Sequence, residues 1–269
     1  MNNHSTWNIW RICLRAAIPG LALCLVGCHA EVDRIVEQSF DQNYKVDPSA
    51  RVSVKNVDGS IRIYGADTSE VKIQAIKKAY GRDRLDKIVI NVAAQANSVS
   101  IDTIYPPKPK FGLSDRSGTV DYVIVVPQTC TISRLELANG EVLVEGLRGG
   151  KVSANLVNGR LFDHNCFGAH QLFVANGGLD IVYDWWERTD LSVDAKIVNG
   201  NARAFIPGEA AFHLLATTVD GNISSDFSEK EERHRGPVQK IDTVVGGLSQ
   251  AVIKIHATNG SIRVAEMNP

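Results

Sequence analysis

The sequence is poor in methionine, aromatic residues and cysteine, and its charges nearly cancel. Of 269 residues, 2 are methionine, 5 are cysteine and 7% are aromatic. The formal charge of −1, from 29 basic and 30 acidic residues, excludes the basic footprint typical of a nucleic-acid-binding protein. A chain of this length buries about three quarters of its unfolded surface, so neither disulfides nor metals are needed to hold a fold together.

The apolar run near the N-terminus is too short to span a bilayer. It covers Ala16 to Val26, is interrupted by Pro19 and Gly20, and follows a segment with Arg11 and Arg15. A spanning helix needs roughly 20 apolar residues, whereas the core of a signal peptide has about 7 to 15. Residues 1–27 are therefore predicted to be an export signal.

The signal ends in Leu25-Val26-Gly27-Cys28. This tetrapeptide resembles the lipobox of bacterial lipoproteins, which implies that cleavage leaves Cys28 as the lipid-modified N-terminus. Several acyl chains on one terminus anchor firmly, since each buried CH₂ contributes about 0.8 kcal/mol. His29 replaces the Asp that often retains lipoproteins in an inner membrane, which favours the outer membrane, facing the periplasm, in a Gram-negative cell. The alternative is an ordinary signal peptide with Cys28 uninvolved.

The expected mature chain has a tether and entry strand at residues 28–50 and one domain at residues 51–269. Cys13 and Cys24 leave with the signal, so Cys130 and Cys166 are the thiols that remain to pair. The repeat described next separates these two by about two strand spacings of roughly 4.8 Å, beyond the roughly 7 Å limit between bridged Cα atoms. We expect no disulfide between them.

A turn dipeptide recurs along the domain. It occurs as Asp58-Gly59, Asn139-Gly140, Asn158-Gly159, Asn176-Gly177, Asn199-Gly200, Asp220-Gly221 and Asn259-Gly260. From residue 139 the intervals are 19, 18, 23, 21 and 39 residues, and the last suggests a repeat that has lost its turn signature. Such a period indicates a repeat architecture.

Alternating segments flank each dipeptide, as in Val52-Ser53-Val54 and Ile61-Arg62-Ile63, which is the pattern of strands with one buried face. Glycine suits a turn through positive φ, and Asn or Asp tolerates the left-handed region. The predicted structural turn residues are Gly59, Gly140, Gly159, Gly177, Gly200, Gly221 and Gly260.

Two all-β folds could use these turns. One is a meander of two-residue hairpins. The other is a β-solenoid, whose coils stack with matching turns in columns. The near-constant spacing favours a single β-solenoid of about 18–23-residue rungs. A short helix or bulged turn is expected between the strand-like segments Val71-Lys72-Ile73 and Ile88-Val89-Ile90, an interval that contains the helix formers Ala75 to Ala79. An exposed loop is expected from Tyr105 to Gly118, and a charged loop from Ser228 to Pro237.

Several motifs resemble a bacterial family of β-strand-repeat proteins known as "putative adhesins", a domain of unknown function. The motifs are Val54-Lys55-Asn56-Val57-Asp58-Gly59-Ser60-Ile61, Val120-Asp121-Tyr122 leading to Val126-Pro127, Leu137-Ala138-Asn139-Gly140, and Thr258-Asn259-Gly260-Ser261-Ile262. The resemblance covers residues 50 to 266 and implies an exported β-solenoid without established catalysis.

Signatures of common enzyme classes are absent from the sequence: it has no HExxH, GxSxG or GxGxxG. The outward positions after the turns read as a mixed set, Glu141, Arg160, Asp180, Asn201, Arg203 and Arg263, rather than clustered carboxylates. Asp163, His164, Cys166 and His170 lack the paired spacing of a zinc site. We therefore expect no catalysis, metal or cofactor. A polysaccharide-acting enzyme on the same scaffold is the alternative.

Tyr183, Trp185 and Trp186 are the candidate partner-binding residues. Neighbouring side chains on a strand point to opposite faces, so at least one Trp should be accessible to a protein or glycan. The competing interpretation is that both rings cover the end of an irregular repeat.

Together these observations predict a lipid-anchored cell-envelope protein with a non-catalytic binding or scaffolding role. Its expected partners are the membrane, through the anchor, and an unidentified envelope protein or glycan. A third possibility is an accessory role in envelope stress or signalling.

Overall fold

The described part of the chain is almost entirely strand. The computed structural model describes residues 35–107, 118–228, 238–247 and 250–267, all within a compact unit that extends from Asp33 to Pro269. The signal at 1–27, Cys28 and the start of the tether lie outside these residues, as do 108–117 and 229–237 of the two expected loops. The prediction of an all-β protein is confirmed. None of the described helical residues form a segment long and apolar enough to cross a bilayer.

The strands join into one open, 15-stranded sheet. Their bounds are β1 Ile35–Lys45, β2 Arg51–Ala66, β3 Glu70–Tyr80, β4 Val89–Gln95, β5 Ser98–Ile104, β6 Thr119–Pro127, β7 Thr131–Glu145, β8 Arg148–His164, β9 Phe167–Val182, β10 Ser192–Pro207, β11 Phe212–Asp220, β12 Ile223–Ser225, β13 Gln239–Val245, β14 Val252–Asn259 and β15 Ile262–Met267. One short helix, α1, spans Arg82–Asp86.

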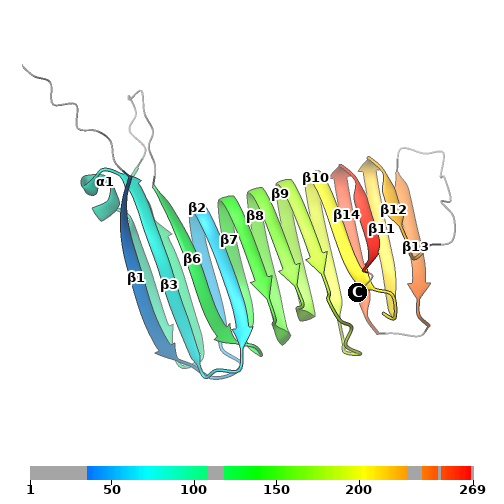
Figure 1. Ribbon diagram of the computed structural model, residues 1–269, viewed down its shortest axis with the longest axis horizontal. Coiled ribbons are helices and arrows are strands. Elements are labelled where there is room, and N and C mark those ends of the chain that lie inside the picture. The colour runs from blue at the N-terminus through cyan, green and yellow to red at the C-terminus, as the bar shows by residue number, and fades with distance from the viewer. Residues whose placement is uncertain (1–34, 108–117, 229–237, 248–249, 268–269) are drawn as a thin grey trace, which may run out of the picture. The chain divides into compact units, whose positions relative to one another are not determined.

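Parallel pairing dominates the centre of the sheet. β2, β7, β8, β9 and β10 lie side by side in that order, each parallel to the next (Figure 1). Asn139 pairs with Asn158, Asn158 with Asn176, and Asn176 with Asn199, so the turns form one column. The segments on either side of a turn pair with the neighbouring strand and not with each other, so these turns are not hairpins.

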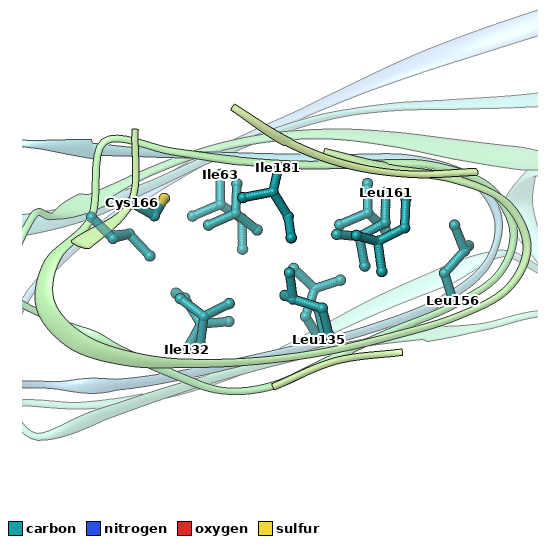
Figure 2. Close-up of a cluster of buried hydrophobic side chains, with 14 of the residues drawn as sticks. Ile63, Ile132, Leu135, Leu156, Leu161, Cys166 and Ile181 are labelled. Atoms are coloured by element: carbon teal, nitrogen blue, oxygen red, sulfur yellow. The ribbon is translucent and has the colours of Figure 1, made fainter. Parts of the chain in front are cut away.

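Each long strand bends at its turn and contributes to two layers. We call the segments before the turns the first layer and those after them the second layer. Figure 2 shows Ile132 and Leu135 from the first layer pointing toward Ile63, Leu161 and Ile181 from the second. All five side chains are buried. The predicted alternation of inward apolar and outward polar residues is confirmed, because strand side chains alternate between faces.

The turn glycines meet two conditions at once. Gly159 has a φ of 136°, and a Cβ added there would lie 1.8 Å from the carbonyl oxygen of Gly140 in the preceding strand. Positive φ is also found at Gly59, Gly140, Gly177, Gly200, Gly221 and Gly260. Glycine is therefore required both by backbone conformation and by close backbone approach.

The turn asparagines differ from the expectation in their backbone conformation. Asn165 is the single described non-glycine residue with positive φ, so the turn asparagines do not occupy the left-handed region. They form a ladder instead. The Nδ2 of Asn158 donates to Oδ1 of Asn139 at 2.9 Å, and the Nδ2 of Asn176 donates to Oδ1 of Asn158 at 2.9 Å. Side-chain amides thus stabilise the column of turns.

The C-terminal end departs from sequence order. β14 lies between β10 and β11 and is parallel to both, and β15 continues it between β10 and β12. Asn259 therefore pairs with both Asn199 and Asp220. We expected the 39-residue interval before Asn259 to contain a repeat that has lost its turn signature. This expectation is wrong. The residues of the interval include β12 and the antiparallel edge strand β13, and the chain then returns to insert a repeat between two earlier ones.

The N-terminal end also changes pairing. β5 lies parallel to the first-layer part of β2, and β6 lies parallel to its second-layer part. β4 then pairs antiparallel with β5, while β3 and β1 extend the other side antiparallel. The short helix expected between Ile73 and Ile88 is present as α1, but it begins at Arg82, after the helix formers Ala75 to Ala79. Those residues belong to β3, because pairing on both sides outweighs their helix propensity.

Cys130 and Cys166 are buried free thiols. Desolvation raises the pKa of Cys130 to about 12, and burial beside Asp163 raises the pKa of Cys166 well above its usual value. Both groups therefore stay protonated at neutral pH and behave as small core residues.

Candidate functional site: a trough across the strands

Outward side chains of the second layer and its antiparallel extension form two rows that cross the strands. The cross-strand register aligns Ser39, Ile76, Asp121, Ser60, Glu141, Arg160, Gly178 and Asn201 in one row, and Asp41, Gln74, Val123, Arg62, Leu143, Phe162, Asp180 and Arg203 in the other. Both rows extend from β1 to β10. Residues far apart in sequence thus share one surface.

A continuous trough with a volume of about 1390 Å³ follows these rows. It is lined by every residue of both rows except Leu143 and Phe162, and by Gly59, Gly140, Gly159 and Gly177 along the column of turns. Neighbouring strands lie about 4.8 Å apart, so eight strands give the trough a length of roughly 34 Å. These dimensions suit a linear polymer lying across the strands.

The charges of the trough occur as neighbouring opposite pairs. Arg203 donates two hydrogen bonds to the Asp180 carboxylate, from Nε at 2.6 Å and from Nη2 at 2.8 Å. This carboxylate raises the pKa of Arg203. Lys78 Nζ lies 3.3 Å from Oδ2 of Asp121, and Oδ1 of the same carboxylate accepts a hydrogen bond from the Ser60 hydroxyl at 3.0 Å. The trough therefore presents alternating charges rather than a field of one sign.

Two further contacts complete this pattern. Arg62 Nη2 lies 3.8 Å from Oε1 of Glu141, and Arg160 Nε lies 3.8 Å from Oδ2 of Asp180. In all, the lining contains four basic and four acidic side chains. Arg62, Glu141 and Arg160 are solvent-exposed in these contacts and remain available to a ligand, whereas Asp180 is buried.

Gly178 leaves room in the floor of the trough. The row places it between Arg160 and Asn201, where other strands carry side chains. A Cβ added at Gly178 would contact only the Arg160 side chain, at 3.3 Å from Nε. The absence of a side chain at this position widens the trough without any backbone requirement.

Leu143 and Phe162 interrupt the polar outward column of the second layer. Both are half-buried beside the trough. The Arg160 guanidinium lies 5.6 Å from the centre of the Phe162 ring, and Arg203 lies 5.8 Å from that of Phe205. Arginines stacked on aromatic rings are common at recognition surfaces because they are held in place while keeping donors free.

The candidate residues Tyr183, Trp185 and Trp186 do not lie on a strand, since β9 ends at Val182. Tyr183 is fully buried, so it packs in the core rather than facing a partner. Its ring contacts Trp186 at 5.5 Å between centroids, and Trp186 contacts Phe212 at 5.7 Å. The difference arises because the chain leaves the sheet here and folds its aromatic side chains over the end of the core.

Trp185 is the exposed member of this group, with 42% of its surface accessible. Its Nε1 donates to Oε1 of Glu187 at 2.9 Å, and Glu187 also accepts from Nη1 of Arg148. The Arg148 guanidinium lies 5.9 Å from the Trp185 ring centre. These contacts hold the indole at the surface, separate from the trough residues.

The residues considered as metal ligands divide between core and surface. Asp163 and His170 are buried, and Oδ2 of Asp163 lies 2.7 Å from Nδ1 of His170 across the two layers. His164 points outward, with Nε2 2.8 Å from Oδ2 of Asp184. Hydrogen bonds from Asn165 and His164 lower the pKa of Asp184. Within the described ranges, His, Cys, Asp and Glu side chains form no group able to hold a metal ion.

Sequence reasoning found one end of the trough and missed the other. It placed Glu141, Arg160, Asp180, Asn201 and Arg203 on the outward face, and the cross-strand register agrees, although Asp180 is buried there. The β1 and β3 residues lie outside the repeat, and no local sequence pattern predicts that they belong to this face. Paired antiparallel strands bring them there.

No family model matches the chain, and no curated protein matches it. Similar solved structures include a "putative cell adhesion protein" from Clostridium sporogenes, 13% identical, covering 86% of this chain and all of that chain, with a TM-score of 0.44. A "putative adhesin" from Bacteroides fragilis is 11% identical over 85% of this chain and 97% of that chain, with a TM-score of 0.27. A "putative lipid binding protein" from Parabacteroides distasonis is 11% identical over 84% and 96%, with a TM-score of 0.20. The chain thus has adhesin-named structural neighbours but no assigned family.

Proposed function

We propose that this protein is a lipid-anchored protein of the cell envelope that binds an envelope partner in the trough without catalysis. The observation that carries the binding role is the arrangement of the trough: an elongated hollow crossing eight strands, lined by polar side chains of both signs. Elongated concave surfaces are the binding faces of repeat proteins generally. We also infer that the parallel stack is a β-solenoid with rungs of about 18–23 residues.

The non-catalytic assignment rests on the pairing of the carboxylates. Hydrolysis of a glycosidic bond uses two carboxyl groups that flank the bond, one acting as an acid. In the trough, Asp180 is engaged by Arg203, Asp121 by Lys78, and Glu141 lies beside Arg62. Three of the four carboxylates of the lining thus lie beside a cation and do not form a free pair that could flank a glycosidic bond. This supports binding over the alternative of a polysaccharide-acting enzyme.

Binding in the trough is tested with an envelope fraction and two variants. Replacing both Arg62 and Arg160 with Ala should weaken binding to this fraction at least tenfold, because both guanidinium groups line the trough. Lys196→Ala is the matched control, since Lys196 is an exposed first-layer residue that pairs with Asp194. Equal binding by the double variant and the control would contradict the trough as the binding site.

The absence of catalysis is tested on its own. Release of reducing ends from envelope polysaccharide would contradict it.

Anchoring at Cys28 is tested separately. The wild type should incorporate a labelled fatty acid and fractionate with membranes, and Cys28→Ser should do neither. Label retained by Cys28→Ser would contradict attachment at this residue. An unlabelled wild type that is secreted would support the ordinary signal peptide.

Trp185 is proposed as a second contact, because its ring is exposed and held by Glu187 and Arg148. Trp185→Ala should reduce binding to the envelope fraction while leaving stability unchanged. Trp186→Ala should instead lower stability, because Trp186 packs on Tyr183 and Phe212. Unchanged binding by a folded Trp185→Ala variant would remove this contact from the proposal.

A further inference from the structure

We infer that the trough binds an uncharged linear polysaccharide, which lies lengthwise across the strands from β10 to β1. The inference deepens the proposed function and rests on its assignment of the trough as the binding site. Three properties of the trough carry it: its charge balance, the nature of its floor and its length.

Charge balance favours an uncharged ligand. The four basic side chains of the lining are Arg62, Lys78, Arg160 and Arg203, and the four acidic ones are Asp41, Asp121, Glu141 and Asp180. The basic side chains would attract a polyanion, but the acidic side chains would repel it. A polycation would be attracted by the acidic side chains and repelled by the basic ones. A chain of hydroxyl groups has no such conflict. Each hydroxyl both donates and accepts, so it can bond guanidinium and carboxylate groups in alternation.

The floor of the trough favours a sugar chain over a peptide. It is the face of a sheet, and the backbone N–H and C=O groups of its strands are engaged with neighbouring strands in the sheet plane. An extended peptide gains affinity mainly by pairing its backbone with a free strand edge. Within the described residues, such an edge occurs at β1, at one end of the trough and not along its floor. What the floor offers instead is side-chain donors and acceptors, including Ser39, Gln74, Glu141 and Asn201.

Length and an opening at Gly178 favour a polymer over a small molecule. The trough extends for roughly 34 Å at about 4.8 Å per strand, far longer than one sugar ring. Gly178 has no side chain in a row where its neighbours carry Arg160 and Asn201. We place one sugar ring of the chain over Gly178.

The decisive variant is Gly178→Tyr, which fills this opening. Gly178 does not have positive φ, and its added Cβ would meet only the flexible Arg160 side chain, so the fold should tolerate the change. Gln171→Tyr is the matched control. It introduces the same side chain on the same strand, β9, at an exposed residue of the first layer. Thermal unfolding of both variants would verify that each is folded.

Calorimetric titrations would use uncharged linear β-glucan and chitin oligosaccharides of increasing length, with polygalacturonate and an extended neutral peptide as competing classes. We expect affinity for at least one uncharged series to increase with chain length until about 34 Å is spanned, and then to level off. Gly178→Tyr should weaken that binding at least tenfold, and Gln171→Tyr should leave it within twofold. Binding should change little between 50 and 500 mM salt, because no net charge is neutralised.

Three outcomes would overturn the inference. The first is preferential binding of polygalacturonate with steep salt dependence. The second is binding of the peptide and not the sugars. The third is sugar binding that Gly178→Tyr and Gln171→Tyr affect equally. If no uncharged oligosaccharide of either series binds, while Gly178→Tyr still abolishes capture of the envelope fraction, the polysaccharide inference fails and the proposed binding function stands.

Discussion

The middle of the sheet and its two ends differ in the direction and order in which their strands pair. From β7 to β10, spatial order equals sequence order and every pair is parallel. At the ends, β1, β3, β4 and β13 pair antiparallel, and β14 enters between two earlier strands. A repeated sequence can bury each repeat against the next, but the first and last repeats lack a neighbour. The ends therefore require strands of another kind, which occupy edges that would otherwise pair with other chains.

The ladder of turn side chains shows the same contrast. In the middle each asparagine donates to the one before it, so Asn158 and Asn176 both give and receive a hydrogen bond. Asp58 occupies the first position and accepts from Asn139 at 2.7 Å. Asp220 occupies the last position, beside Asn259, where a carboxylate cannot donate and continue the ladder. The two aspartates thus mark where the stack begins and ends.

The largest expected effect concerns the buried pair in the middle of the stack. His170→Leu should lower the free energy of unfolding by about 3 to 5 kcal/mol, because it leaves the Asp163 carboxyl buried without its partner. Replacing both, with Asp163→Val and His170→Leu, should recover most of this loss, since the neighbouring strand has Ile181 in the Asp163 position. Urea unfolding measures both. If the double variant is as unstable as His170→Leu, the Asp163–His170 pair adds more to the free energy of unfolding than the mutual compensation of its two buried groups.

The next effect compares a middle glycine with an end glycine. Gly159→Ala should cost about 3 kcal/mol, combining a positive φ with a Cβ 1.8 Å from a carbonyl oxygen. Gly81→Ala, before α1, should cost only about 1 kcal/mol, because Gly81 has a φ of 89° but nothing within 4 Å of an added Cβ. Equal losses on urea unfolding would mean that close approach between strands is unimportant.

A smaller effect is expected for the ladder. Asn158→Ala removes two side-chain hydrogen bonds and should lower stability by about 1 to 2 kcal/mol. Asp220→Ala at the end of the ladder should change stability by less than about 0.5 kcal/mol, as is usual for a surface substitution. If chemical denaturation gives the two variants the same stability, the ladder is not a stabilising feature of the middle.

The last effect is a pH dependence that arises from the buried thiol of Cys130, just before β7. The pKa of Cys130 is raised from 9.0 to about 12 by burial, so the folded state holds a proton that the unfolded state releases. Stability from this group is complete below about pH 9 and is lost as pH rises toward 12. Cys130→Ala should therefore flatten the decline of stability across this range. An unchanged slope in denaturation curves from pH 8 to pH 11 would contradict the assignment to Cys130.

The repeat could be recognised in the sequence because its pattern is local. Each Asn-Gly or Asp-Gly dipeptide lies between alternating segments, and that pattern predicts strands, inward residues and turns without knowledge of neighbours. The intervals between the dipeptides could be counted in the sequence, but the reason why they differ could not be inferred from it. In the structure, the longest interval between sequential neighbours of the middle, from Asn176 to Asn199, includes the segment around Trp185 that leaves the sheet. The turns stay in register because the additional residues lie on the opposite side of the stack.

Other features depended on contacts between distant segments. The trough exists because Ser39 and Gln74, outside the repeat, align with Ser60 and Arg62 within it. Asp163 was considered in the sequence as a possible metal ligand, yet it faces His170 across the core. Tyr183 was a candidate partner-binding residue, yet it is covered by Phe167 and Trp186. In each case the environment of the side chain is set by a partner that the local pattern does not specify.

Periodicity alone thus determined that this protein is all-β, which residues face inward and where the chain turns, because these follow from alternation and from the conformational freedom of glycine. Tertiary structure decided the order of the strands at both ends, the amide ladder and the trough. Strand pairing is a choice among distant partners with similar local patterns, and the free energy that selects among them comes from burial and hydrogen bonding in the assembled sheet.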